Sequence, residues 1–320
     1  MQRTPVRSDT VGLVIFLVVA FAGGWLLCLP LFLTASPSPW LVKGIELVMM
    51  YTPALGVLIA VLVRRRRLAN SAADQTEPHD RSAILPLGLQ FGGSFRRCLP
   101  YLIAGLVIFV VAGLAAPFVA AAFGLVHLDL VHFSGYAEQL HATLTKAGSG
   151  AEMPPLPIWL LVIIQVGQVP VASIIPNGLA TFGEEIGWRG FLLPGLLRWG
   201  QWPALVVMGV IWGLWHTPLL LLGLNYPGHH LLAIPLMIGF TTITGTILGW
   251  LRLSSGSIWP SVIAHGALNA TGTSALLFRQ AGTSYDPTLV GPAGLTGWIL
   301  PALVIVVLVI IRRLPVRNPR

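Results

Sequence analysis

Residues 11–34 read VGLVIFLVVAFAGGWLLCLPLFLT, a run that contains no charged side chain. About 20 mostly apolar residues in a helix are enough to cross the hydrocarbon core of a bilayer. The run is longer than the apolar part of a signal peptide, and no small-residue cleavage site follows it. We therefore expect a membrane-spanning helix that remains as an uncleaved anchor.

The composition of the whole chain extends this expectation to the rest of the protein. Of its 320 residues, 55% are hydrophobic and 9% are charged, and the mean hydropathy is +0.81. A soluble domain carries about 25% charged residues, and a disordered chain needs much charge and few apolar residues. A membrane β-barrel needs alternating segments of about 10 residues, whereas the apolar runs here are continuous. We predict an all-α polytopic membrane protein.

The hydropathy pattern predicts about eight transmembrane helices in a single membrane domain, residues 1–320. The polar gaps between the helices are too short and too polar to fold as a separate soluble domain. The predicted spans are Val11–Thr34, Gly44–Val63, Leu99–Gly124, Ile158–Phe182, Pro203–Gly223, Leu231–Leu251, Ile258–Phe278 and Ala293–Ile311.

The basic residues predict the orientation of these helices. With Arg3 and Arg7 in the cytoplasm, eight spans place all but three of the 19 lysines and arginines on the cytoplasmic side, and the exceptions are Lys43, Lys146 and Arg279. Such an excess is the positive-inside pattern. We expect an integral protein of the cell membrane with both termini in the cytoplasm. The net charge of +8 then indicates contact with membrane lipid rather than with nucleic acid.

A first polar motif lies at the end of the fourth predicted span, in the sequence TFGEEIGWR, residues 181–189. Residues four apart lie on one face of a helix, so Glu185 and Arg189 can pair. Glu184 is turned by about 100° from Glu185 and points elsewhere. Burial would make the Glu184 carboxylate easier to protonate, as a general base requires. The alternative is that all three charges cap a helix end near the headgroups.

Two further motifs repeat the spacing of four in later spans. Trp212 precedes His216, with Pro218 two residues further on, and His265 precedes Asn269 in a run of small residues. The small residues would let another helix approach His265 closely. Either histidine, taken alone, is equally explained by packing or by a hydrogen bond between helices.

The three motifs together suggest a reactive site. Glu184, His216, His265 and Asn269 come from three different spans, and a polar group in an apolar run needs a partner. We expect them to share one cavity. The set contains a base, a second proton carrier and two hydrogen-bond donors, as hydrolysis by an activated water with a separate oxyanion site requires.

In this order and in a membrane context, the motifs resemble the CPBP family, the CaaX protease and bacteriocin-processing intramembrane proteases, which include the type II CaaX prenyl endopeptidases. The resemblance covers residues 157–275, which would form the catalytic core, and residues 1–124 would be accessory spans. One departure is Trp212, where the family usually has phenylalanine.

The resemblance implies a role for each motif residue. Glu184 and His216 would activate a water molecule, and His265 and Asn269 would stabilise the oxyanion. The catalytic residues are then Glu184, His216, His265 and Asn269. The residues that support the site are Glu185, Arg189 and Trp212. The substrate would be a membrane-proximal peptide or a lipidated protein.

The need for a metal stays open at this point. The family is often labelled as metalloproteases, and Glu184, His216 and His265 would be the zinc ligands. However, asparagine is an unusual zinc ligand, and the HExxH motif is absent. We expect a mechanism that requires no cofactor, with zinc as the alternative.

Two other functions use the same residues. Buried Glu, His and Asn side chains can relay protons in a transporter, although the chain has no internal repeat typical of such folds. A catalytically silent scaffold or immunity protein is the second alternative. The sequence does not specify the natural substrate, the oligomeric state or the biological process.

Overall fold

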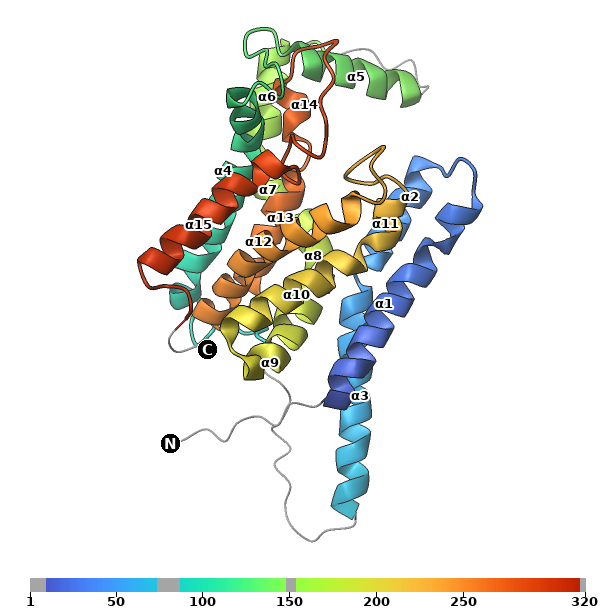
Figure 1. Cartoon of the computed structure of the whole chain (residues 1–320), viewed down its shortest axis with the longest axis vertical. Helices are drawn as coiled ribbons and strands as arrows, with labels where there is room; N and C mark the ends of the chain where they lie inside the picture. The colour runs from blue at the N-terminus through green and yellow to red at the C-terminus, as the bar shows by residue number, and fades with distance from the viewer. Residues whose placement is uncertain (1–9, 74–86, 148–153, 317–320) are drawn as a thin grey trace.

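The chain folds into a bundle of helices, which confirms the predicted all-α class (Figure 1). The computed structural model describes residues 10–73, 87–147 and 154–316, and no strand occurs within these ranges. The predicted positions of Arg3, Arg7 and three other arginines, Arg81, Arg317 and Arg320, lie outside the described residues.

The described chain up to residue 174 holds three long helices and four shorter ones. The long helices are α1 (Thr10–Leu33), α3 (Thr52–Ala73) and α4 (Phe95–Ala122). The shorter ones are α2 (Pro39–Met49), α5 (Ser134–Ala147), α6 (Ile158–Gly167) and α7 (Val169–Ile174). The rest of the chain is more interrupted. It holds α8 (Asn177–Glu185), the π-helical η1 (Ile186–Leu192), α9 (Leu193–Leu196), the 3₁₀ turn η2 (Leu197–Trp199), α10 (Gln201–Trp215), α11 (Thr217–Leu221), α12 (Ala233–Ser255), α13 (Trp259–Ala270), α14 (Ser274–Phe278), the 3₁₀ turn η3 (Leu295–Trp298) and α15 (Ile299–Ile310).

The structure does not confirm the count of eight membrane spans. Within the described ranges, five helical stretches are long and apolar enough to cross a membrane by length and composition. They are Thr10–Leu33, Pro39–Arg67, Phe95–Ala122, Ile158–Trp199 and Ala233–Ser255. The other three predicted spans contain α10, α13 and α15, with 15, 12 and 12 residues. At 1.5 Å per residue, a helix of 12 residues is about 18 Å long, short of the ~30 Å hydrocarbon core.

Proline interrupts several of the apolar runs, which is why hydropathy overestimates the helix lengths. Pro170 opens α7, Pro176 precedes α8, and Pro218 lies in the first turn of α11. Proline has no N–H and breaks a helix interior. A break at membrane depth is tolerated where neighbouring groups satisfy the freed backbone atoms. At the break before Pro218, the hydroxyl of Thr217 donates to the carbonyl of Leu214 at 2.7 Å.

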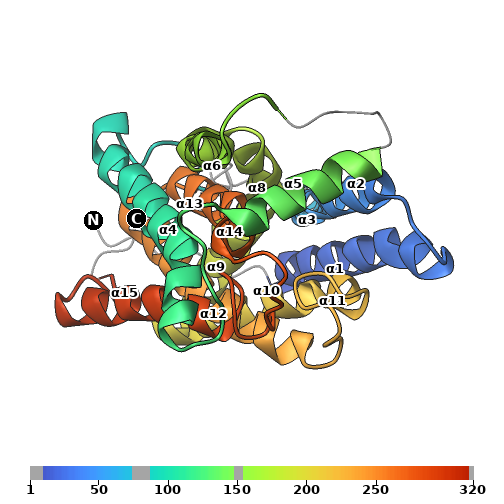
Figure 2. The same ribbon diagram turned by 90° about the horizontal axis from the view of Figure 1, so that it is seen from above.

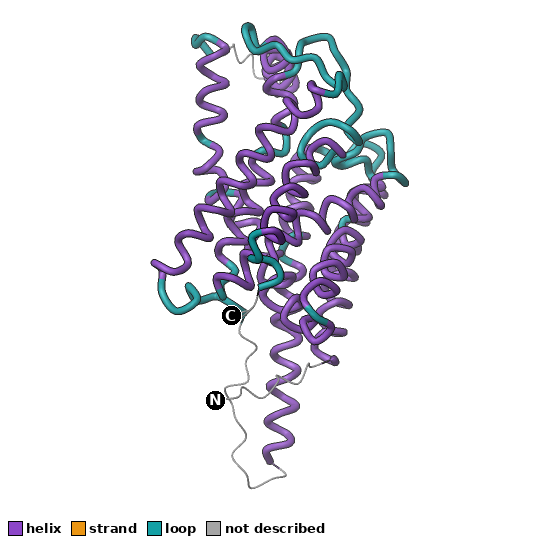
Figure 3. Tube along the Cα trace, turned by 60° about the vertical axis from the view of Figure 1, so that its left-hand side comes forward, coloured by secondary structure: helices purple, strands orange, loops and turns teal. Residues whose placement is uncertain are grey.

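The helices form two groups around a central set (Figures 1 and 2). α1 and α3 pack along each other on one side, and α4 and α15 lie on the opposite side. Between them, α10 packs on α12, and α13 packs against α4, α7 and α8. The loops gather chiefly at one end of the bundle (Figure 3). This arrangement puts the three motif-bearing segments in the middle of the molecule.

The basic side chains of the described residues cluster toward one end of the bundle. The helix ends that carry them lie in the lower part of Figure 1, whereas α2, with Lys43, and α14, followed by Arg279, lie toward the other end. The clustered arginines are Arg64, Arg65, Arg66, Arg67, Arg96, Arg97, Arg198, Arg252, Arg312 and Arg313. The segregation agrees with a positive-inside orientation.

Glycines allow the N-terminal helices to approach the segment that follows the first motif. A Cβ atom on Gly187 would collide with the ring of Pro53 and would lie 3.0 Å from the ring of Phe16. A Cβ atom on Gly183 would lie 2.6 Å from the carbonyl oxygen of Met50. The first motif is therefore packed directly against α1 and α3.

The substitution Gly187→Ala is expected to destabilise the protein by about 1–3 kcal/mol, because an added methyl group overpacks this contact. Thermal unfolding in detergent measures the effect. Gly44→Ala on α2 is the matched control, since no atom lies within 4 Å of its added Cβ. Equal unfolding temperatures for the two variants would show that this contact does not hold the bundle together.

Candidate active site

A buried ion-paired cluster joins the first and third motifs. The Oε1 atom of Glu185 lies 2.8 Å from Nη1 of Arg189 and 2.9 Å from Nδ1 of His265. The side chains of Glu185 and Arg189 are fully buried, and that of His265 is 5% exposed. The predicted pairing of Glu185 with Arg189 is confirmed. The contact with His265 brings α13 onto the same carboxylate and was not predicted.

Glu184 points away from this cluster, as its position in the helix predicts. Its Oε2 atom accepts hydrogen bonds from the indole N–H of Trp212 at 2.6 Å and of Trp188 at 3.3 Å. Glu184 is 2% exposed. A buried carboxylate is costly unless hydrogen bonds compensate its lost hydration, and the two indole groups supply them.

Trp212 is the contact point of all three motifs. Its indole N–H holds Glu184, the guanidinium carbon of Arg189 lies 4.2 Å from its ring centre, and the ring of His265 meets it edge to face at 5.1 Å. A cation over an indole face is attracted by the ring quadrupole. Phenylalanine at this position could pack in the same way but could not donate to Glu184. The departure at Trp212 therefore adds a hydrogen bond to the site.

His216 lies at the end of α10 and is half-buried. Its Nδ1 atom is 2.8 Å from the carbonyl oxygen of Trp212. Since a carbonyl only accepts, Nδ1 carries the proton, and in the neutral ring Nε2 keeps its lone pair. Glu184 and His265 lie near enough to His216 to interact with it electrostatically. His216 can thus accept a proton at Nε2 beside a carboxylate.

Asn269 differs from the other three predicted catalytic residues. It lies one turn beyond His265 on α13 and is exposed, and its side chain makes no hydrogen bond within the described ranges. The expectation that the four residues hydrogen-bond to one another is therefore wrong for the described structure. Instead, Glu184 accepts from the N–H groups of two tryptophans, His216 contacts a backbone carbonyl, and His265 contacts Glu185.

Three polar atoms of the buried cluster have no partner among the described residues: Oε2 of Glu185 and Nε and Nη2 of Arg189. Buried polar atoms of this kind are rare and mark places where a core can accept a further polar group. Gly245 on α12 makes room beside them, since a Cβ there would lie 3.2 Å from Nη2 of Arg189.

The zinc alternative requires side chains that could together hold a metal ion. No group of three His, Cys, Asp or Glu side chains that could hold a metal ion occurs in the described part of the chain. Each of the three candidate zinc ligands, Glu184, His216 and His265, contacts Trp212.

Two site residues were missed by sequence reasoning. Trp188 is fully buried and donates to Glu184, and its spacing of four from that residue repeats the spacing of Glu185 and Arg189. That spacing was the available signal. Trp215 is also buried, and its ring meets the ring of His216 at 4.9 Å.

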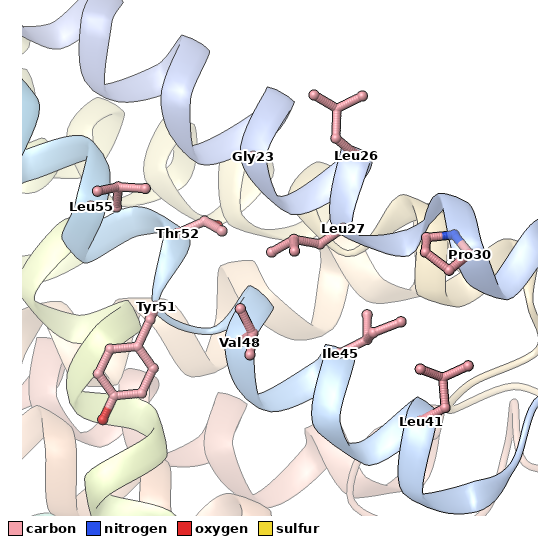
Figure 4. A pocket seen from close by; sticks show the side chains of 10 residues that line it. All are labelled: Gly23, Leu26, Leu27, Pro30, Leu41, Ile45, Val48, Tyr51, Thr52 and Leu55. Atoms are coloured by element: carbon pink, nitrogen blue, oxygen red, sulfur yellow. The ribbon is translucent and has the colours of Figure 1, made fainter.

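A separate apolar pocket of about 720 Å³ lies between α1 and the segment of α2 and α3 (Figure 4). Leu27, Ile45 and Val48 are among its lining residues. Two polar residues of its wall contact the rest of the bundle: Tyr51 donates to the carbonyl of Leu179 on α8 at 2.6 Å, and Thr52 donates to a carbonyl of α1. The pocket contains none of the motif residues.

These features define a polytopic helical membrane protein with a buried carboxylate, arginine and histidine site inside its bundle. Residues 159–271 match the family "Type II CAAX prenyl endopeptidase Rce1-like". The matched segment, about a third of the chain, carries all three motifs. This similarity agrees with the resemblance to type II CaaX prenyl endopeptidases.

A curated relative agrees with the family match. The chain is 33% identical over 108 residues to CAAX prenyl protease 2 of Methanococcus maripaludis. The aligned part is 32% of this chain and 39% of that relative, so the chain spans well under half of the relative's length. No solved structure matches the chain.

A double-mutant cycle over Glu185 and Arg189 tests the buried cluster. Arg189→Met should cost about 3–5 kcal/mol of unfolding free energy, because it leaves a buried carboxylate without its cation. The double variant Arg189→Met with Glu185→Gln should lose much less unfolding free energy than the sum of the losses in the two single variants. Chemical unfolding in detergent measures all four proteins.

The matched control for this cycle is the exposed pair Lys43 and Glu46, whose charged atoms are 2.6 Å apart. Exposed pairs contribute about 0–1 kcal/mol. A coupling energy between Glu185 and Arg189 no larger than that of the control would contradict the central place given to the buried cluster.

Proposed function

We propose that this protein is an intramembrane endopeptidase that hydrolyses a peptide bond in a membrane-proximal peptide or lipidated protein, with a prenylated C-terminus as the first substrate to test. The observation that carries the proposal is the gathering of Glu184, His216 and His265 around buried Trp212. The names of the matched family and of the curated relative support the substrate class.

In the proposed mechanism, Glu184 and His216 activate a water molecule. The Glu184 carboxylate or Nε2 of His216 takes a proton from the water as its oxygen attacks the peptide carbonyl carbon. The carbonyl oxygen becomes an oxyanion, and the C–N bond then breaks as the nitrogen receives that proton. A base and a proton carrier that lie near each other can perform both transfers.

His265 and Asn269 are the proposed donors to the oxyanion. His265 keeps Nδ1–H on Glu185, so it can donate from Nε2 only as an imidazolium. Asn269 is exposed and carries an amide without a described partner, so its N–H₂ group is available to a substrate. Donors aimed at the developing charge are typically worth 10²–10³-fold in rate.

The environment of the reaction follows from the charge distribution. The end of the bundle that carries the arginine cluster is proposed to face the cytoplasm, in the cell membrane, with both chain termini on that side. Substrate would then come from the cytoplasm or from the inner leaflet.

Cleavage of quenched peptides, prenylated and unprenylated, by the purified protein tests the proposal. Wild type should cleave, and Glu184→Ala should lose almost all activity because it removes the base. Glu46→Ala is the control, since this carboxylate pairs only with exposed Lys43 in the described structure.

Equal cleavage by wild type and Glu184→Ala would remove Glu184 from the chemistry. An absence of cleavage by either protein would favour the scaffold or transporter alternatives.

We expect that a metal chelator leaves the cleavage rate unchanged, because Glu184 accepts from two indole groups and both histidines are hydrogen-bonded through Nδ1. The measurement compares rates before and after EDTA treatment and dialysis. Loss of activity that added zinc restores would overturn the metal-free mechanism.

A further inference from the structure

The helix break that carries His216 leaves two backbone carbonyls without their usual donors. In an unbroken helix, the N–H of residue 218 would bond the carbonyl of Leu214, but Pro218 has no N–H. The next residue, Leu219, donates to the carbonyl of His216 at 3.0 Å instead of to that of Trp215. In the hydrocarbon region of a bilayer no water can bond a free carbonyl, so each of the two needs another donor.

Different parts of the chain satisfy the two carbonyls. The hydroxyl of Thr217, within the break, donates to Leu214. The carbonyl of Trp215 accepts from the indole N–H of Trp25 at 3.2 Å. Trp25 belongs to α1, which lies beside α10 and α11 (Figures 1 and 2), and it is 190 residues away in the sequence.

α1 holds the side chain of Trp215 as well as its backbone. The indole N–H of Trp215 donates to the carbonyl of Ala20 at 3.1 Å, and Thr52 on α3 donates to the same carbonyl at 3.1 Å. The ring of Trp215 in turn packs edge to face on the ring of His216. The residue immediately before His216 is thus fixed at two points by a helix outside residues 159–271.

We infer that Trp25 is a positioning residue for His216: its indole N–H caps the helix break and thereby holds the imidazole next to Glu184. The inference rests on the proposed function in so far as His216 takes part in hydrolysis. It assigns to α1 a direct role in the geometry of the site. Trp25 does not touch the reacting atoms and is not a catalytic residue.

The experiment compares Trp25→Phe with Trp40→Phe. Phenylalanine keeps an aromatic ring but removes the N–H. Trp40 is 87% exposed on α2 and makes no hydrogen bond through its side chain within the described ranges. Trp25→Phe should lower kcat about tenfold, the worth of about one hydrogen bond to an otherwise unpaired group, while KM stays within about twofold. Trp40→Phe should change neither constant.

Hydrogen–deuterium exchange supplies a measurement that does not depend on activity. Peptides that span residues 213–222 should exchange faster in Trp25→Phe than in wild type, because the cap of the break is lost. Peptides from α4 should exchange at the wild-type rate in both variants, which separates local loosening from general unfolding. A benzothienylalanine at position 25, which keeps the shape of the ring but lacks the N–H, should behave as Trp25→Phe does.

Three outcomes would overturn the inference: unchanged exchange at residues 213–222, an activity loss confined to KM, or exchange that rises throughout the bundle. Wild type and Glu184→Ala are measured alongside. If wild type does not cleave, the proposed function fails, and the exchange measurement alone decides whether Trp25 holds the break. If wild type cleaves and Trp25→Phe matches it, only the positioning role fails.

Discussion

The carboxylate of Glu185, shared between Arg189 and His265 in the interior of the bundle, is the interaction on which the rest of the site depends. A lone carboxylate there would be prohibitively costly, and one with two cationic or donor partners is stable. Because its partners come from η1 and α13, the carboxylate fixes these segments together. Arg189 in turn lies on the face of Trp212, which hydrogen-bonds Glu184. The two adjacent carboxylates thus have different surroundings: Glu185 is ion-paired, and Glu184 accepts hydrogen bonds from indole groups.

The helical membrane fold and the pair of Glu185 with Arg189 could be predicted from the sequence, because both depend on patterns within short segments. The spacing of four predicted the pair of Glu185 and Arg189, and the apolar runs predicted a helical membrane protein. The contact of Glu185 with His265 joins residues 80 positions apart, and no local pattern encodes it. Burial of Asn269 was predicted from its apolar neighbours, but its side chain is exposed, since the hydropathy of a run does not tell which face a residue occupies.

The helix count could not be predicted for a related reason. Hydropathy measures how apolar a run is, whereas the length of a helix also depends on whether backbone bonds continue through it. At Pro218, one apolar run is broken into two helices, α10 and α11. Hydrogen bonds from Thr217 and Trp25 stabilise that break. Trp25 lies outside residues 159–271, the segment that matches the Rce1-like family. The geometry of the site therefore draws on parts of the chain that its motifs do not reveal.

The central claim is that a water molecule activated at Glu184 hydrolyses a peptide bond directly. Mass spectrometry of the new C-terminus, formed from a prenylated peptide in ¹⁸O-labelled water with added hydroxylamine, tests it most directly. The account predicts a carboxylate that carries one ¹⁸O atom, produced by wild type and not by Glu184→Ala. A hydroxamate product would reveal an acyl-enzyme intermediate. Formation of the labelled carboxylate by Glu184→Ala would show that Glu184 does not activate the water. Either result would contradict the account.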